Sequence, residues 1–196
     1  GLCTFLAAEG IEDCRKCCGG HGYLLASGVA AVGADFVWQT TAEGDFIVMM
    51  LQCARFLIKA LKAAKAGKPT PGPCSYLNVL NNPNVNVLEC GPPPAKSFEE
   101  FFDSQRILAV YRYRSLVAIS TVGEELQTLL DRGLSFDEAW NECAVELVNA
   151  VRAHCLSFML STFADEVSKV EDRNCARVLN NLCCLFGLTY IIDDQW

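Results

Sequence analysis

All seven prolines of this 196-residue chain lie in one segment, residues 67–96. The segment is also rich in Asn and Gly, so it favours turns and extended chain over a regular element. Because proline breaks the interior of a helix, its confinement to this segment leaves both flanking regions open to long helices. We therefore expect a helical domain over residues 1–66, a proline-rich linker over 67–96 and a second helical domain over 97–196.

The first region contains two predicted helices. The first covers residues 2–18, where apolar residues recur at near-helical spacing until Gly19-Gly20 ends the pattern. Residues 21–44 contain several glycines and are predicted to form a long loop with short helical turns. The second helix runs from about residue 45 to residue 66. Its apolar stripe consists of Ile47, Met50, Leu51, Ala54, Leu57, Ile58 and Leu61.

The region after the prolines contains two capping-box patterns. Ser97 with Glu100 predicts the start of a long helix that ends near Gly133, and Ser135 with Glu138 predicts the start of the next. A third helix is expected from about Asp172. Short connections between such helices favour antiparallel neighbours. The predicted fold class is therefore all-α, with bundles of antiparallel up-down helices and no strand.

Composition and charge exclude several classes of protein. With 52% hydrophobic residues the chain can build a core, and a net charge of −7 argues against a nucleic-acid-binding protein. No apolar run appears long enough to span a membrane. The first residues lack the basic stretch of a signal peptide, and the last residues carry no recognised targeting tail. Because the chain also starts without Met, we expect a fragment or a processed chain.

The twelve cysteines are expected to be free and mostly buried. Cys14-x-x-Cys17 lacks the second pair of ligands that a structural zinc site needs, and it follows a predicted helix rather than a thioredoxin-like strand. Free thiols indicate a reducing, intracellular compartment. His154 lies on an apolar helical stripe and is interpreted as a core histidine. His21 lies in "GGHGY", which is either a helix end with a turn or a backbone cradle for an anion.

The order of two motifs carries a family resemblance. "CRKCCGGHGY" at residues 14–23 is followed by "EGD" at 43–45 and "VMMLQCARFLIK" at 48–59, with weaker matches at "CSYLN", "VNAVRAHC" and "LNNLCCLFGL". This arrangement resembles the flavin-dependent acyl-CoA oxidases of peroxisomal fatty-acid β-oxidation, which are relatives of the acyl-CoA dehydrogenases. The resemblance implies the C-terminal helical portion of such an enzyme, a homodimer, and residence in the peroxisome.

The resemblance also implies roles for individual residues. Glu43 corresponds to the base that removes the α-proton of a fatty acyl-CoA, while FAD accepts the β-hydrogen and molecular oxygen becomes hydrogen peroxide. A carboxylate is an adequate base there when the thioester oxygen is polarised in a dry site. Gly44 would allow the substrate to approach closely. The FAD-binding residues implied are Gly19, Gly20, His21 and Asp45, the two glycines facing an FAD held mainly by the partner subunit.

Two positions depart from the family pattern. Ala42 stands where the family usually has an aromatic residue, and Phe46 stands where it usually has Asn. These departures keep open a second hypothesis, that the chain is a non-catalytic helical module for subunit association. A third hypothesis, a cysteine-rich redox or metal protein, is disfavoured by the ligand spacing.

Overall fold

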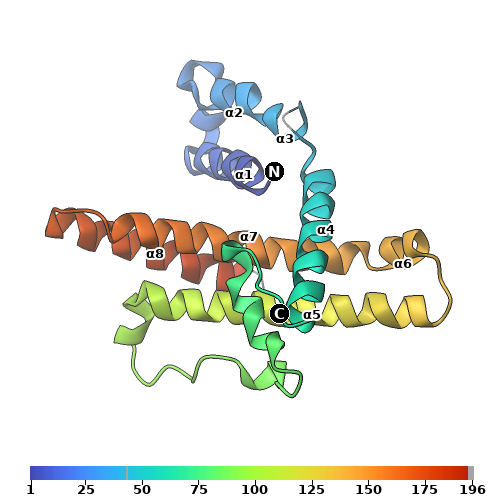
Figure 1. Ribbon diagram of the computed structural model, residues 1–196. Coiled ribbons are helices and arrows are strands. Elements are labelled where there is room, and N and C mark those ends of the chain that lie inside the picture. Colours follow the sequence, from blue (N-terminus) through green and yellow to red (C-terminus); the bar gives the residue numbers. More distant parts are fainter. Residues whose placement is uncertain (43, 194–196) are drawn as a thin grey trace. The chain divides into compact units, whose positions relative to one another are not determined.

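The computed structural model describes residues 1–42 and 44–193, and these residues form helices connected by short loops, without a strand. The all-α prediction is confirmed for this part of the chain (Figure 1). The chain divides into two compact units, residues 1–55 and 56–196, with the division inside one long helix. The three-part domain assignment, with boundaries at 66 and 96, stays a prediction.

The N-terminal unit is a helical hairpin followed by the first part of a long helix. Its elements are α1 (Leu2–Cys17), the 3₁₀ helices η1 (Gly19–Tyr23) and η2 (Leu25–Ser27), α2 (Val29–Val37), α3 (Gln39–Ala42) and the beginning of α4 (Phe46–Lys65). The C-terminal unit contains the rest of α4, the 3₁₀ helices η3 (Gly72–Asn81), η4 (Val87–Glu89) and η5 (Glu99–Phe102), and the helices α5 (Ser104–Asp131), α6 (Phe136–Glu142), α7 (Ala144–Val167) and α8 (Arg173–Asp193).

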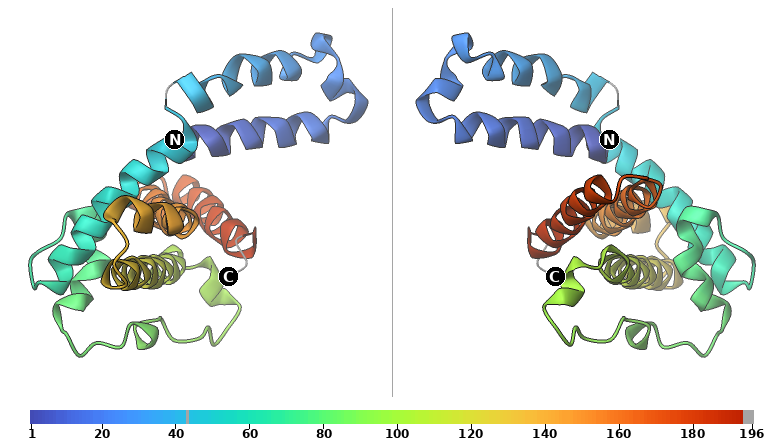
Figure 2. Two further views of the ribbon diagram at one scale, coloured as in Figure 1. Left: turned by 90° about the vertical axis from the view of Figure 1, so that its right-hand side faces the viewer. Right: turned by 90° about the vertical axis from the view of Figure 1, so that its left-hand side faces the viewer.

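The predicted loop over residues 21–44 is wrong, because most of these residues are helical. α2 runs antiparallel to α1 and packs on it (Figure 2). Gly33 lies at this contact, since a Cβ there would be 3.5 Å from Cγ2 of Ile11, an ordinary van der Waals distance. The glycines lower the helix propensity of this stretch, but packing against α1 compensates for that weakness.

Three long helices form the C-terminal unit. Along the chain α5, α7 and α8 alternate in direction, which confirms the predicted up-down arrangement (Figure 1). Tyr111 of α5 is fully buried, and its hydroxyl donates to the carbonyl oxygen of Gly187 in α8 at 2.6 Å. A Cβ at Gly187 would lie only 2.7 Å from Cγ2 of Ile107, so this glycine permits the close contact between α5 and α8.

Helix boundaries in this unit agree with the sequence at one capping box and differ at the other. Ser135 and Glu138 form the predicted capping box, but the helix that they open breaks at Cys143 into α6 and α7. The expected helix start at Ser97 is wrong, because α5 begins after Asp103, whose carboxylate accepts from the amides of the first turn. Phe98 packs edge-on against Phe102 with ring centroids 5.5 Å apart, which favours the short turn η5 instead.

The proline-rich segment is more regular and more buried than predicted. It contains the ten-residue 3₁₀ helix η3, which buries Cys74, Leu77 and Leu80. The hydroxyl of Tyr76 lies 2.9 Å from Nδ1 of His154, a buried residue of α7. Burial lowers the pKa of His154 to about 4. The interpretation of His154 as a core histidine is therefore confirmed, and the segment is attached to the core rather than being only a linker.

The twelve cysteines are thiols rather than disulfides, as expected, but most are not buried. Four are buried, three are half-buried and five are exposed. The exposed cysteines lie in α1 or directly after it, apart from one near the start of α8. They are Cys3, Cys14, Cys17, Cys18 and Cys175. The buried set is Cys74, Cys143, Cys183 and Cys184.

Two described helices are long and apolar enough to cross a membrane by length and composition, Ala144–Val167 and Arg173–Ile192. They bear only weakly on the expectation that the chain has no membrane span. Half of the apolar window of the first helix is buried in the protein, but only 17% of that of the second is. Core helices of ordinary globular proteins meet the same criteria, so these two helices are weak evidence for a membrane protein.

The capping box at Ser135 should contribute measurably to stability. Ser135→Ala removes the acceptor for the Glu138 amide, and we expect it to lower the free energy of unfolding by about 1 kcal/mol. Ser97→Ala, at the capping box that does not start a helix, serves as the control and should change little. Urea denaturation followed by circular dichroism measures both variants. Equal effects for the two substitutions would contradict the conclusion that Ser135, but not Ser97, caps a helix.

Buried His154 should make stability depend on pH. Its pKa falls from 6.5 in the unfolded chain to about 4 in the fold, so the unfolded state binds more protons between these values. The stabilisation is complete above pH 6.5 and is lost as the pH falls toward 4, by up to about 1.4 kcal/mol per pH unit. Urea denaturation between pH 6.5 and 5, above the usual carboxyl range, measures this loss. His154→Gln should flatten the slope; an unchanged slope would exclude His154 as its source.

Candidate active site

The glycine turn after α1 is shaped by contacts with the last turn of that helix. Gly19 has a φ of +58°, a left-handed conformation that favours glycine. Gly22 is buried, and a Cβ there would lie 2.0 Å from the carbonyl oxygen of Arg15 and 3.1 Å from Cβ of Cys18. The turn therefore needs glycine at both positions simply to fold against α1.

Gly20 differs from these two neighbours. Its φ is not left-handed, and a Cβ there would meet no atom within 4 Å. Folding of the described residues therefore gives no reason for glycine at this position. An exposed glycine in open space does allow a ligand to approach the backbone closely. His21 is also exposed beside it, so both predicted cofactor-binding residues are accessible.

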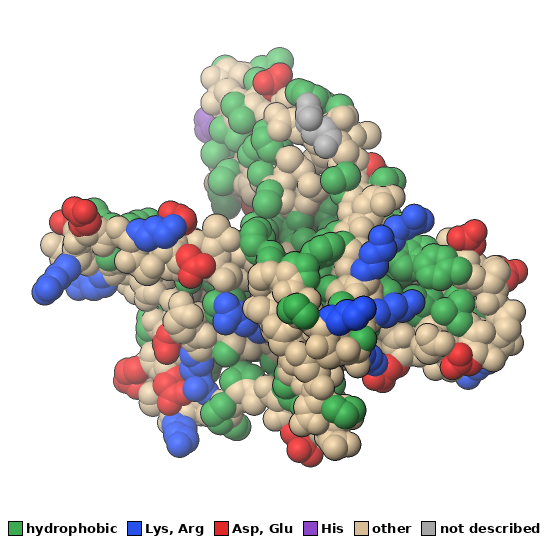
Figure 3. Space-filling view, in the orientation of Figure 1, with side chains coloured by type: hydrophobic (Ala, Val, Ile, Leu, Met, Phe, Trp, Pro, Cys, Tyr) green, Lys and Arg blue, Asp and Glu red, His purple; other side chains and the backbone are tan. Residues whose placement is uncertain are grey.

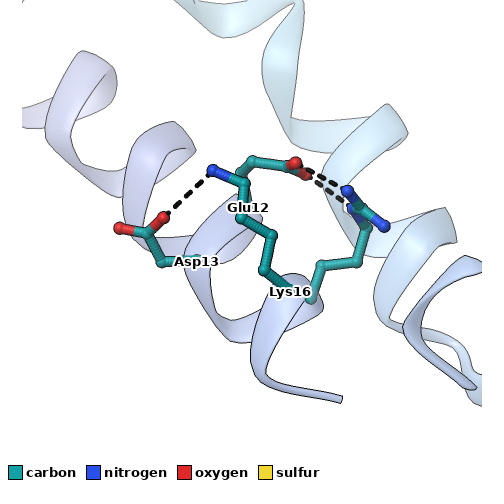
Figure 4. Close-up of polar contacts among 4 residues, drawn as sticks. Glu12, Asp13 and Lys16 are labelled. Atoms are coloured by element: carbon teal, nitrogen blue, oxygen red, sulfur yellow. Dashed lines mark hydrogen bonds and ion pairs between the residues drawn. The ribbon is translucent and has the colours of Figure 1, made fainter. Parts of the chain in front are cut away.

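Paired charges lie on α1 next to this turn (Figure 4). Arg15 makes two hydrogen bonds of 2.7 Å to the carboxylate of Glu12, which lower the pKa of Glu12. Lys16 lies 3.3 Å from Asp13. Because both basic side chains already have carboxylate partners, an anion at the turn would depend mainly on the backbone and on close approach at Gly20.

The second part of the predicted site lies at the start of α4. Gly44 has a φ of +119°, and a Cβ there would lie 3.0 Å from Cγ of Met49, so only glycine fits without strain. Asp45 caps the helix, since its Oδ1 accepts a 3.1 Å hydrogen bond from the amide of Val48. The predicted base, Glu43, lies outside the residues that the structure describes.

The structure does not bring the two parts of the predicted site together within the N-terminal unit. The glycine turn lies at the C-terminal end of α1, whereas the start of α4 lies near its N-terminal end (Figure 2). Phe5 of α1 stacks on Phe46 of α4 with ring centroids 4.5 Å apart, which fixes that end. The 16 residues of α1 span about 24 Å. Within one chain, Gly20 and Gly44 therefore cannot touch the same small chemical group.

The stacking of Phe46 explains one departure from the family pattern in physical terms. Its ring lies nearly parallel to that of Phe5, at 19°, so it helps to attach α4 to α1. An asparagine at this position would lose that aromatic contact and gain an amide. The neighbouring departure, Ala42, is the exposed last residue of α3.

Large hydrophobic side chains are exposed throughout the N-terminal unit, as its visible face shows (Figure 3). Tyr23 and Leu25, directly after the glycine turn, are 81% and 79% exposed. Exposed apolar faces are what the resemblance to a longer, multi-domain enzyme implies, and the three consecutive large apolar residues after the glycine turn are the local signal for this patch. Such patches usually mark contacts with other protein surfaces. The exposed set is Tyr23, Leu24, Leu25, Val32, Val37, Trp38, Ile47, Val48 and Met49.

The predicted site residues do not line the pockets of the C-terminal unit. Three pockets there have volumes of about 290 to 400 Å³. The largest is an apolar groove along α5 and the start of α7. Within residues 1–42 and 44–193, no group of three His, Cys, Asp or Glu side chains is arranged to hold a metal ion.

Comparison with known families identifies both regions of the chain. The family model for the acyl-CoA oxidase C-alpha1 domain matches residues 1–58, and the acyl-CoA oxidase model matches residues 103–195. The peroxisomal acyl-coenzyme A oxidase 1 of Mus musculus is 37% identical over 185 residues, which is 94% of this chain and 28% of the mouse protein. The chain thus spans little more than a quarter of the length of the curated relatives that it matches.

Solved structures agree with this assignment. Acyl-CoA oxidase 1 of Arabidopsis thaliana superimposes with a TM-score of 0.87 and 31% identity, over 97% of this chain and 28% of the plant protein. Acyl-CoA oxidase-2 of Caenorhabditis elegans, solved with FAD, ascaroside-CoA and ATP, superimposes with a TM-score of 0.80 and 29% identity, over 97% of this chain and 27% of the nematode protein. The chain therefore belongs to the acyl-CoA oxidase family and corresponds to its C-terminal helical portion.

Proposed function

We propose that this chain is part of an FAD-dependent acyl-CoA oxidase that converts a fatty acyl-CoA to the trans-2-enoyl-CoA. Membership of the family supports the reaction class, and the names of the relatives support residence in the peroxisome. Within this chain, the observation that supports the proposed reaction is the backbone geometry at the start of α4. There, Gly44 adopts a φ of +119° that favours glycine, and Asp45 caps the helix that follows.

Glu43 has the role of base in this proposal. Its carboxylate removes the proton from the carbon next to the thioester, which is feasible when that thioester oxygen is polarised and water is excluded. When bound, FAD supplies the acceptor for the β-hydrogen with its electron pair, and molecular oxygen takes these electrons to give hydrogen peroxide. Gly44 leaves room beside the base because it has no side chain.

We propose that Gly19, Gly20 and His21 contact an FAD held mainly by a second copy of the chain. The open space at Gly20 supports this, because a glycine with no packing role fits a close ligand contact. The length of α1 supports it further, since the glycine turn and Gly44 of the same chain lie too far apart to contact one reacting group. The exposed apolar residues after the turn are compatible with a subunit interface.

A second candidate function is a non-catalytic module for subunit association. Phe46 favours it, because its ring is used to attach α4 to α1 and offers no amide to a ligand. Flavin content and peroxide production distinguish the two functions. The full-length protein that carries this chain is yellow and produces peroxide from palmitoyl-CoA or a shorter acyl-CoA in the first case. It holds no flavin in the second.

The base assignment predicts a selective loss of turnover in the full-length protein. Glu43→Gln should reduce peroxide formation by about 100-fold or more, because general base catalysis typically contributes that much. The flavin absorbance should remain, since the variant keeps the size of the side chain. Glu9→Gln, at an exposed glutamate of α1, is the control and should be fully active. Normal turnover by the Glu43 variant would rule out its role as base.

The glycine turn predicts a selective loss of cofactor. Gly20→Asp places a negative side chain in the open space, so it should lower the flavin content of the purified full-length protein and repel the anionic diphosphate of FAD. Gly10→Asp, in the middle of α1 and equally open, is the matched control. Flavin absorbance per protein, together with circular dichroism to verify folding, measures the effect. Equal flavin content in the two variants would exclude a cofactor contact at Gly20.

A further inference from the structure

Three exposed cysteines lie at the end of α1, directly before the glycine turn. Cys14 and Cys17 belong to the last turn of the helix, and Cys18 follows it. In the described part of the chain, no group of three potential metal ligands includes them. Their chemistry is therefore that of accessible thiols, which react with oxidants and with each other.

Helix geometry places Cys14 and Cys17 within reach of each other. Residues three apart rise about 4.5 Å along a helix and lie about 60° apart around its axis, so their Cα atoms are separated by about 5 Å. Disulfide-bonded cysteines have Cα separations of about 4.4–6.8 Å. Cys18 lies about 6 Å from Cys14 along the axis alone, near the upper limit, so Cys17 is the better partner.

A bond between Cys14 and Cys17 requires the last turn of α1 to rearrange. Cβ atoms three residues apart on a helix are separated by about 5–6 Å, whereas a disulfide holds them at about 3.8 Å. The last turn moves more easily than the helix interior, because its carbonyl groups lack regular helical partners. The amide of Cys18 already bonds at 3.2 Å to the carbonyl oxygen of Arg15, three residues back, as in a tightened turn.

The glycine turn packs on the segment that such a bond would displace. Arg15 lies between the two cysteines, and a Cβ added to buried Gly22 would collide with its carbonyl oxygen. Gly22 is thus in direct contact with the Arg15 peptide. Movement of that peptide displaces Gly22 and with it the turn that contains Gly20.

We propose that Cys14 and Cys17 form a peroxide-induced disulfide that distorts the glycine turn. The sulfur of one thiol attacks hydrogen peroxide and breaks the O–O bond, which gives a sulfenic acid and one water that takes the thiol proton. The sulfur of the second thiol displaces the sulfenic hydroxyl, which forms the S–S bond and releases a second water. The cysteines lose two electrons, and the peroxide gains them. The consequence for flavin rests on the proposed function, in which the turn contacts FAD and the enzyme makes the peroxide.

Peroxide treatment of the full-length protein tests the disulfide, because trypsin cuts after Arg15 and after the lysine that follows. Hydrogen peroxide is added in small excess, and the remaining thiols are capped with iodoacetamide. Mass spectrometry should then find the peptide that ends at Arg15 joined to the one that begins at Cys17, until dithiothreitol separates them. Cys14→Ser and Cys17→Ser should abolish the joined species. Cys18→Ser, and Cys175→Ser at an exposed cysteine of α8, are the controls and should retain it.

Flavin binding tests the consequence for the turn. In the yellow full-length protein, the same treatment should lower the affinity for FAD severalfold, dithiothreitol should restore it, and Cys17→Ser should be insensitive. Because the peroxide is added, the joined peptides report on the disulfide whether or not the protein has oxidase activity, so failure of the proposed function is a separate result. The proposal is overturned by the absence of joined peptides, by their persistence in Cys17→Ser, or by disulfide formation in the yellow protein without weaker FAD binding.

Discussion

The length of α1 is the constraint on which the rest of the candidate site depends. Its 16 residues hold the glycine turn at one end of the hairpin, and the Phe5–Phe46 stack holds the start of α4 at the other. A helix is stiff over this distance, so side-chain motion cannot close a gap of about 24 Å. If both ends serve catalysis, they must serve it at different places.

In the proposed oxidase, this geometry would require two copies of the chain for each complete active site. Each copy would provide Glu43 to one active site and the turn around Gly20 to the other. The hairpin also exposes large apolar side chains such as Tyr23 and Leu25 next to the turn, which favours burial against other protein surfaces. The relatives are more than three times as long as the part matched here, so their remaining regions can cover such surfaces as well.

Local sequence signals predicted some elements well. The capping box at Ser135 involves neighbours within one turn, and the structure confirms it. Most of the predicted apolar stripe of α4 is buried, but Ile47 at its start is 47% exposed. The prediction was wrong where distant contacts decide. α2 is helical because it packs on α1 despite Gly33. The burial of η3 likewise depends on distant helices such as α7.

The sequence proposes residues for the candidate site but does not indicate how they are arranged. The motif resemblance identified Gly20 and Gly44, and the structure adds that one is open and the other is conformationally required. Their separation follows from the hairpin, which no short motif encodes.

The claim that the two parts serve different active sites is tested most directly by mixing two full-length variants. Copies with Glu43→Gln and copies with Gly20→Asp, carrying different affinity tags, would be co-expressed and the mixed dimer purified through both tags. One of its two sites then has an intact base from one copy and an intact glycine turn from the other. The account predicts about half of the wild-type peroxide formation per dimer, although each variant alone is inactive. An inactive mixed dimer would contradict it.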